Sequence, residues 1–96
     1  MTYLGTQAED LSSPPRPYRK ICVVGAGSWG TALATVARRA GRETSLWGRD
    51  AETVEAINSR NENPKYLPGI PLPEGLHATT DLADALDGAQ AVLLVT

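Results

Sequence analysis

The sequence has a single cysteine, a single histidine and no long apolar run, and each shortage excludes a class of protein. One cysteine, Cys22, cannot form an intramolecular disulfide and favours a reducing, cytoplasmic location. Because Cys22 lies within an apolar run, we expect it to be a small buried side chain rather than a redox group. No apolar stretch approaches the roughly 20 residues that a membrane span needs. Glu9 and Asp10 stand where a secretory signal would carry its apolar segment.

Basic residues are too few to suggest a nucleic-acid-binding surface. The chain of 96 residues holds nine Lys and Arg against eleven Asp and Glu, for a net charge of −2. A nucleic-acid-binding domain usually carries a clustered excess of positive charge instead. His77 has no acidic or cysteine partner evident in the sequence, so we expect a surface side chain and neither catalysis nor metal binding. Lys65 receives no role from the sequence.

What the sequence does contain is an alternation of apolar strands and amphipathic helices. Residues 1–19 carry three prolines and no apolar period, which predicts a flexible tail. Residues 20–96 predict one domain, with strands at 21–24, 43–47, 76–79 and 91–95. Helices are expected from the glycines to about residue 40, over about 51–60, and from residue 82 onward. This β-α-β-α-β-α-β order predicts an α/β fold of the Rossmann type, a parallel sheet with helices on both faces.

Apolar spacing predicts the inward face of each helix, and polar residues predict its ends. Asp50 is expected to cap the start of the second helix, Thr80 or Asp81 the start of the third, and Gly41 to end the first. Apolar residues at i, i+3, i+4 and i+7 mark a buried face. The residues predicted to face inward are Leu33, Val36, Ala37, Ala40, Val54, Ile57, Leu82, Ala85, Leu86 and Ala89.

The strand at 91–95 is the most apolar segment of the chain. In the usual Rossmann order, 3-2-1-4, it would lie at the edge of a four-stranded sheet. An uncovered apolar edge pairs readily with other chains. We therefore expect marginal stability or self-association through residues 91–95.

Gly25, Gly27 and Gly30 form a G-x-G-x-x-G pattern between the first predicted strand and the first predicted helix. In that position the pattern is typical of a dinucleotide site. Gly25 permits the tight turn, Gly27 lets the backbone approach a pyrophosphate, and Gly30 lets the helix pack closely on the strand. The N–H groups at the helix start then bind phosphate. A glycine-rich turn without a ligand is the alternative.

Three neighbouring residues have two interpretations each. Ser28 either donates to a phosphate oxygen or caps the helix, and Trp29 either packs under the cofactor or seals the helix start against a loop. Arg49, 19 residues after Gly30, lies where an acidic residue selects NAD and an arginine accommodates the 2′-phosphate of NADP. Because Asp50 is already expected to cap a helix, Arg49 favours NADP, with NAD possible. Otherwise, Arg49 is an exposed loop charge.

Three stretches of the chain occur in an informative order. They are residues 24–34 with the glycine turn, residues 46–50 (Leu-Trp-Gly-Arg-Asp), and residues 63–69 (Asn-Pro-Lys-Tyr-Leu-Pro-Gly), the last followed by Leu72 and Pro73. Together they resemble the bacterial form of the NAD(P)-dependent sn-glycerol-3-phosphate dehydrogenase family. The third stretch is the most particular, because no general feature of a Rossmann fold requires Tyr-Leu-Pro-Gly in a loop.

This resemblance covers residues 20–96 and implies a function. The family transfers hydride between NAD(P)H and dihydroxyacetone phosphate, giving sn-glycerol 3-phosphate for phospholipid synthesis. The resemblance implies cofactor contacts at Ser28, Trp29 and Arg49, and at Tyr66 unless that residue only anchors its loop. The family's catalytic lysines and substrate domain follow the matched region and are expected beyond Thr96. No catalytic residue is therefore predicted within the sequence, and the chain alone is expected to be inactive.

Two other functions remain open on the sequence alone. One is a related dehydrogenase, such as a ketopantoate reductase or a sugar-acid dehydrogenase, against which the 63–69 loop argues. The other is a non-catalytic module that senses NAD(H) by binding alone, which the shortness of the chain favours.

Overall fold

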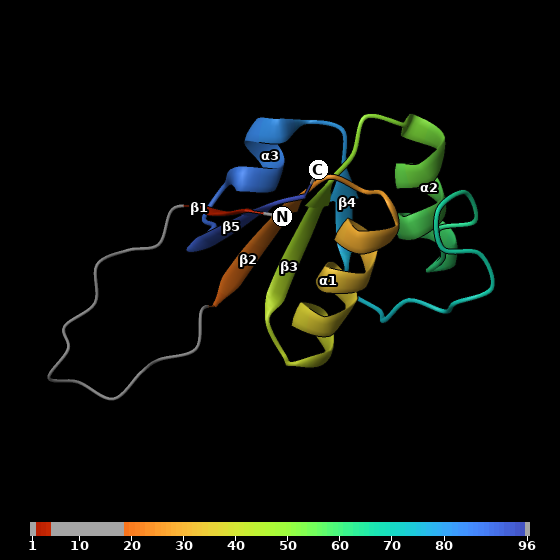
Figure 1. Cartoon of the computed structure of the whole chain (residues 1–96), viewed down its shortest axis with the longest axis horizontal. Helices are drawn as coiled ribbons and strands as arrows, with labels where there is room; N and C mark the ends of the chain where they lie inside the picture. Colours follow the sequence, from red (N-terminus) through yellow and green to blue (C-terminus); the bar gives the residue numbers. More distant parts are fainter. Residues whose placement is uncertain (1, 5–18, 96) are drawn as a thin grey trace, which may run out of the picture.

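A single five-stranded sheet organises the chain, as Figure 1 shows for the computed structural model, which describes residues 2–4 and 19–95. The strands lie in the order β1-β5-β2-β3-β4. Strands β2, β3, β4 and β5 are mutually parallel, and β1 pairs antiparallel with β5. The parallel strands thus confirm the predicted 3-2-1-4 order. The strand bounds are β1 Thr2–Leu4, β2 Lys20–Val24, β3 Glu43–Trp47, β4 His77–Thr79 and β5 Ala91–Leu94.

Within the described residues the helices are α1 (Ser28–Arg39), α2 (Ala51–Arg60) and α3 (Leu82–Leu86). As predicted, the carboxylate of Asp50 caps α2 by accepting from the backbone N–H of Glu52 at 3.0 Å. Asp81 caps α3 in the same way. Gly41, with φ of +86°, takes the left-handed conformation that commonly ends a helix, here directly after the C-cap of α1.

The helices divide between the two faces of the sheet (Figure 1). Because side chains alternate along a strand, Leu46 and Ser45 of β3 point to opposite faces. Leu46 belongs to the main apolar core with Ala34 of α1 and Ile57 of α2. Ser45 instead donates to the carbonyl of Ala85 in α3 at 2.6 Å. The main apolar core therefore lies between the sheet and helices α1 and α2, as predicted for Ile57, and α3 covers the other face of the sheet.

The buried face of α1 differs from the prediction. Ala34 and Thr31 are fully buried, whereas Val36 is 67% exposed. The cause is the close approach of the helix to the turn, since a Cβ on Gly30 would lie 1.6 Å from the carbonyl oxygen of Gly25. Only small side chains fit so near the strands. Of the other residues predicted to face inward, Leu33, Ala37 and Ala89 are half-buried and Ala40, Leu82 and Leu86 are exposed.

Strand β5 is not an edge, so the expected edge position of residues 91–95 is wrong, while self-association itself stays a prediction. β1 pairs along it, with Thr2 opposite Leu94 and Leu4 opposite Val92. These three residues provide the main-chain partners that the open side of β5 would lack. The predicted flexible tail is accordingly wrong at Thr2–Leu4, and the rest of that prediction, apart from Arg19, lies outside the described residues.

The end of the predicted domain also differs slightly from the structure. The last strand was expected over 91–95, whereas β5 ends at Leu94. Thr96, the last residue of the predicted domain, lies outside the described residues. The structure therefore describes the predicted domain from residue 20 to residue 95.

Candidate functional site

A cavity of about 240 Å³ lies at the carboxyl ends of β2 and β3. In parallel sheets ligands bind at this edge, beside the turns that leave the strands. Backbone hydrogen bonds join the ends of neighbouring strands there. The Gly25 N–H donates to the Trp47 carbonyl at 2.9 Å, and the Gly48 N–H donates to the Thr79 carbonyl at 3.1 Å. The lining residues are Gly25, Ala26, Gly27, Trp47, Gly48, Arg49, Asp50, Thr53 and Tyr66.

Three positions in and around this cavity require glycine, because a Cβ at any of them would clash with neighbouring atoms. Gly25 has φ of +121°, and a Cβ there would lie 2.7 Å from the carbonyl oxygen of Val95. A Cβ on Gly30 would overlap Gly25, and one on Gly48 would lie 2.7 Å from the Cβ of Ala26. The predicted roles of Gly25 and Gly30 in turn and packing are thus confirmed, whereas Gly48 was not identified from the sequence.

Gly27 differs from these three, because neither the backbone nor the packing requires a glycine there. Its φ of −76° is open to any residue, and a Cβ would meet no atom of residues 2–4 and 19–95 within 4 Å. It is the N-cap of α1, provides no side-chain acceptor, and no acidic residue occupies the first turn of this fully described helix. The start of α1 is therefore an open, electropositive backbone surface of the kind that binds phosphate.

A proline-rich loop between α2 and β4 forms a second wall, and Asn63 fixes it to the turn. The buried Asn63 amide donates to the carbonyl of Ala26 at 3.1 Å and to the Thr31 hydroxyl at 2.9 Å. Its side-chain oxygen accepts from the backbone N–H of Tyr66 at 3.1 Å. One side chain thus satisfies three polar groups and holds the loop beside the cavity.

For Ser28 and Trp29 the structure contradicts one of the two interpretations, the helix cap and the seal of the helix start, while their contacts with a cofactor stay predictions. Ser28 is the first residue of α1, not its cap, and its hydroxyl donates to the carbonyl of Tyr66 at 2.6 Å. Its hydroxyl proton is therefore directed at the loop and not at the cavity. Trp29 is 75% exposed, so it does not seal the helix start. Tyr66 anchors the loop through its backbone and, as a residue that is 41% exposed, also lines the cavity.

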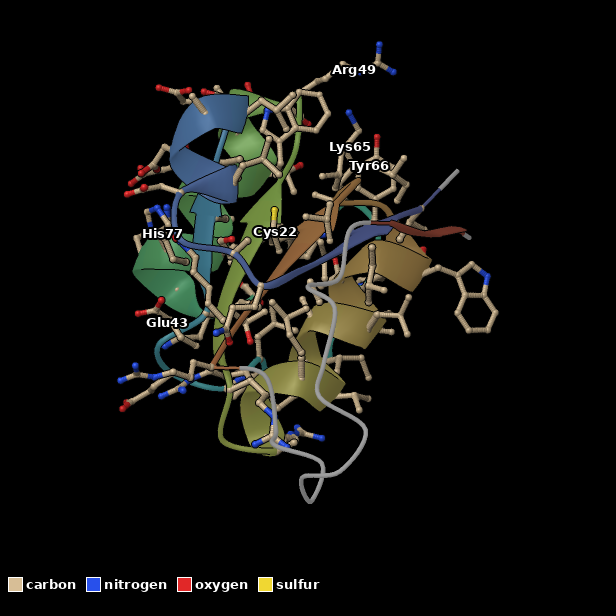
Figure 2. All side chains as sticks on the ribbon, turned by 90° about the vertical axis from the view of Figure 1, so that its left-hand side faces the viewer. Cys22, Glu43, Arg49, Lys65, Tyr66 and His77 are labelled. Atoms are coloured by element: carbon tan, nitrogen blue, oxygen red, sulfur yellow. The ribbon has the colours of Figure 1, made fainter. Side chains whose placement is uncertain are left out.

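Charged side chains gather at one rim of the cavity, where Figure 2 shows Arg49, Lys65 and Tyr66 at the same end of the sheet. Arg49 is exposed, and no carboxylate of the described residues lies within ion-pair distance of it. Asp50 accepts from the Thr53 hydroxyl at 2.9 Å and from Lys65 at 3.1 Å. These bonds, from Thr53 first and then Lys65, lower the pKa of Asp50, and the bond to Asp50 raises the pKa of Lys65.

Several of these residues escaped sequence reasoning. Asp50 was identified only as a cap, and Thr53, Asn63 and Lys65 were given no part in a site. The motif around Asn63 resembles that of a family, but no local sequence pattern predicts that the Asn63 amide bonds to the glycine turn. An isolated Asn in a loop has no recognisable period, so only the folded contact reveals its role.

Cys22 and His77 lie away from the cavity (Figure 2). Cys22 is fully buried, and burial raises the pKa of its thiol, which confirms the prediction of a buried side chain. His77 has the acidic partner that the sequence did not reveal, since its Nε2 lies 2.9 Å from a carboxylate oxygen of Asp84. Across the described ranges, no helix is long and apolar enough to cross a membrane, and no cluster of three potential metal ligands occurs.

Comparison with known families gives a match over the whole sheet-forming region that follows β1. Residues 20–96 match the family described as the N-terminus of NAD-dependent glycerol-3-phosphate dehydrogenase. A relative from Stenotrophomonas maltophilia strain K279a, named glycerol-3-phosphate dehydrogenase (NAD(P)+), is 66% identical over 77 residues. The match covers 80% of this chain and 23% of that relative. The relative of the same name from Rhodospirillum rubrum is 60% identical over 75 residues, covering 78% and 22%.

Solved structures agree with the sequence comparison. The glycerol-3-phosphate dehydrogenase of Coxiella burnetii superposes with a TM-score of 0.74 at 41% identity, covering 81% of this chain and 24% of that one. The yeast enzyme superposes with a TM-score of 0.72 at 31% identity, covering 83% and 26%. This chain therefore spans about a quarter of the length of the proteins that it matches.

Proposed function

The chain belongs to the family of NAD-dependent glycerol-3-phosphate dehydrogenases, whose N-terminal region it matches over residues 20–96, and we propose that it forms the part that binds the dinucleotide. The relatives' printed names give NAD(P)+ as cofactor, and the cavity at the carboxyl ends of the strands provides a place for it.

The observation that carries this proposal is the open space at Gly27. A glycine whose φ suits any residue, and whose Cβ would touch none of the residues that the structure describes, is explained by a ligand that needs this space. A pyrophosphate there would accept from the N–H groups at the start of α1 and benefit from the helix dipole. Gly25 and Gly30 shape this turn, and Ser28 and Trp29 contribute the first helical N–H groups.

The adenosine end of the cofactor would occupy the cavity between the glycine turn and the loop. Tyr66 and Arg49 both line this space, and Arg49 is exposed. A guanidinium without a carboxylate partner favours a phosphate ligand. We therefore propose NADP as the preferred cofactor, with Arg49 beside the 2′-phosphate, and NAD as the alternative.

The whole enzyme would use this site for hydride transfer. When bound, the cofactor would supply the hydride donor for dihydroxyacetone phosphate in its reduced form and the hydride acceptor for sn-glycerol 3-phosphate in its oxidised form. The role of this chain is to bind and orient the cofactor, and none of its described residues is assigned to proton transfer or to substrate. We propose that the catalytic residues lie beyond Thr96 and that the chain alone is inactive. We also propose that the protein acts in the cytoplasm, where a lone buried thiol such as Cys22 is ordinary.

Titration with NADPH and NADH tests the proposal. We expect both to bind, with NADPH tighter, and Arg49→Ala to weaken NADPH by about tenfold, the effect of losing one charge-assisted contact of roughly 1.4 kcal/mol. NADH should be little affected. Arg39→Ala is the matched control, because Arg39 is an exposed arginine in the last turn of α1 and does not line the cavity. Equal affinities that Arg49→Ala leaves unchanged would refute the role in binding the 2′-phosphate.

A further inference from the structure

Asp50 and Arg49 stand side by side at the cavity rim, although they favour different cofactors. Asp50 lies 20 residues after Gly30, near the position from which an acidic residue of a Rossmann fold accepts the ribose 2′-hydroxyl of NAD. The same carboxylate would repel the 2′-phosphate of NADP. A site that accepts NADP therefore needs an explanation of what its acidic residue does.

The hydrogen bonds of Asp50 direct both of its oxygens away from that task. Oδ1 accepts from the backbone N–H of Glu52 at 3.0 Å, and Oδ2 accepts from the Thr53 hydroxyl at 2.9 Å. The third donor is the Lys65 ammonium, 3.1 Å from Oδ2. The first two bonds belong to the start of α2, but Lys65 comes from the loop on the other wall.

The position of Lys65 is fixed by its neighbours. Its loop is tied to the glycine turn by the buried Asn63, and its ammonium lies 5.4 Å from the centre of the Tyr66 ring, within cation–π distance. The Lys65 side chain is 60% exposed and that of Asp50 31% exposed. An ion pair so open to solvent contributes little to folding. Its principal consequence is electrostatic, since one positive charge cancels the carboxylate.

We propose that Lys65 is a cofactor-specificity residue, which pairs with Asp50 across the cavity rim so that Arg49 alone sets the charge presented to the 2′-phosphate of NADP. The inference rests on the proposed function, because it concerns the same cavity. It assigns Lys65 a positioning and charge-cancelling role, without contact to the cofactor. The motif residue for which the sequence offered no role thereby becomes the partner that makes Asp50 compatible with a phosphate.

Removal of the pair in two steps tests this role. Lys65→Met keeps the length of the side chain and leaves Asp50 unpaired. A charge of −1 at roughly 8 Å from a charge of −2 in water weakens binding about sixfold. We expect that loss for NADPH and no loss for NADH, measured as Kd by calorimetry at fixed ionic strength. Arg60→Met, which breaks the ion pair of Arg60 with Glu62 outside the cavity, should change neither Kd.

The decisive variant is the double substitution Lys65→Met with Asp50→Asn. Asparagine caps helices as well as aspartate, so the start of α2 is kept while the negative charge is removed. We expect the double variant to regain the NADPH affinity of the unsubstituted chain. A double variant as weak as Lys65→Met would overturn the inference and indicate direct contact between Lys65 and phosphate.

Circular dichroism on each variant separates a change of binding from a loss of fold. If all variants are folded, and Lys65→Met weakens NADPH and NADH equally, the charge-cancelling role is wrong while the proposed function stands. If the unsubstituted chain binds neither cofactor, the proposed function itself fails. The two failures are therefore distinguishable.

Discussion

The two walls of the cavity are specified by different physical means. The glycine turn is fixed by excluded volume, because Gly25, Gly30 and Gly48 each lack space for a Cβ. The 61–75 loop is fixed by hydrogen bonds from a few side chains, chiefly those of Asn63 and Ser28. A side chain that violates the steric requirement disrupts the whole turn, whereas the loss of one hydrogen bond loosens the loop only in part. Substitutions in the two walls should therefore differ in size and in kind.

Gly30→Ala should have the largest effect. Its new Cβ would lie 1.6 Å from the carbonyl oxygen of Gly25, so α1 must move away from β2. We expect a loss of at least about 3 kcal/mol of unfolding free energy, because backbone atoms cannot yield as a side chain does. Urea denaturation followed by circular dichroism measures it. A loss below about 1 kcal/mol would show that the turn is not sterically fixed.

Asn63→Ala should come next. It removes the donor to the buried Thr31 hydroxyl and the shorter of two bonds to the carbonyl of Ala26, which keeps only the 3.4 Å bond from that hydroxyl. Leaving buried polar groups unpaired costs about 2 to 3 kcal/mol. The matched control is Asn58→Ala. Asn58 is an exposed residue of α2 whose side chain bonds to the backbone of Ala78. If Asn58→Ala proves the more costly of the two, Asn63 is not the principal anchor of the loop.

Ser28→Ala should have a smaller effect. It removes one hydroxyl donor to the Tyr66 carbonyl in an exposed part of the molecule. We expect about 1 kcal/mol or less in stability. The change should appear as faster amide hydrogen exchange around Tyr66 and not around α1. Equal acceleration on both sides would contradict the separate specification of the two walls.

Acidification should give the smallest and most gradual change. The pKa of Asp50 is lowered by its bonds to Thr53 and Lys65, and that of Asp84 by its bond to His77. Groups with lowered pKa values stabilise the folded state above their unfolded pKa, and this contribution disappears as pH falls through the folded value. Stability should therefore be constant near neutral pH and decline below about pH 4. In thermal melts recorded over a pH series, the Tm of the Asp50→Asn variant should fall less steeply at acidic pH than that of the unsubstituted chain.

The same contrast explains how much the sequence revealed. The glycine turn, the cap at Asp50 and the parallel strand order follow from local patterns, so they were predicted correctly. The bonds of the Asn63 amide to Ala26 and Thr31 join residues more than thirty positions apart in the chain, spanning 37 and 32 positions. No local period encodes such a contact.

Two errors have their own physical causes. The predicted face of α1 assumed that apolar residues turn inward, but close packing at Gly30 admits small ones such as Thr31 and Ala34 and leaves Val36 exposed. The pairing of β1 with β5 was missed because Thr2–Leu4 is too short to show an alternation. Both errors arise where tertiary contacts override local preference.

Binding of NADPH to the Gly27→Val variant tests whether the glycine turn binds the pyrophosphate, since no contact among the described residues requires a glycine there. The backbone conformation suits valine, and we expect a change in stability of no more than about 1 kcal/mol from the altered cap. If the turn binds the pyrophosphate, the folded variant should bind NADPH at least about a hundredfold more weakly, which corresponds to about 2.7 kcal/mol. An unchanged Kd in a folded Gly27→Val chain would contradict it.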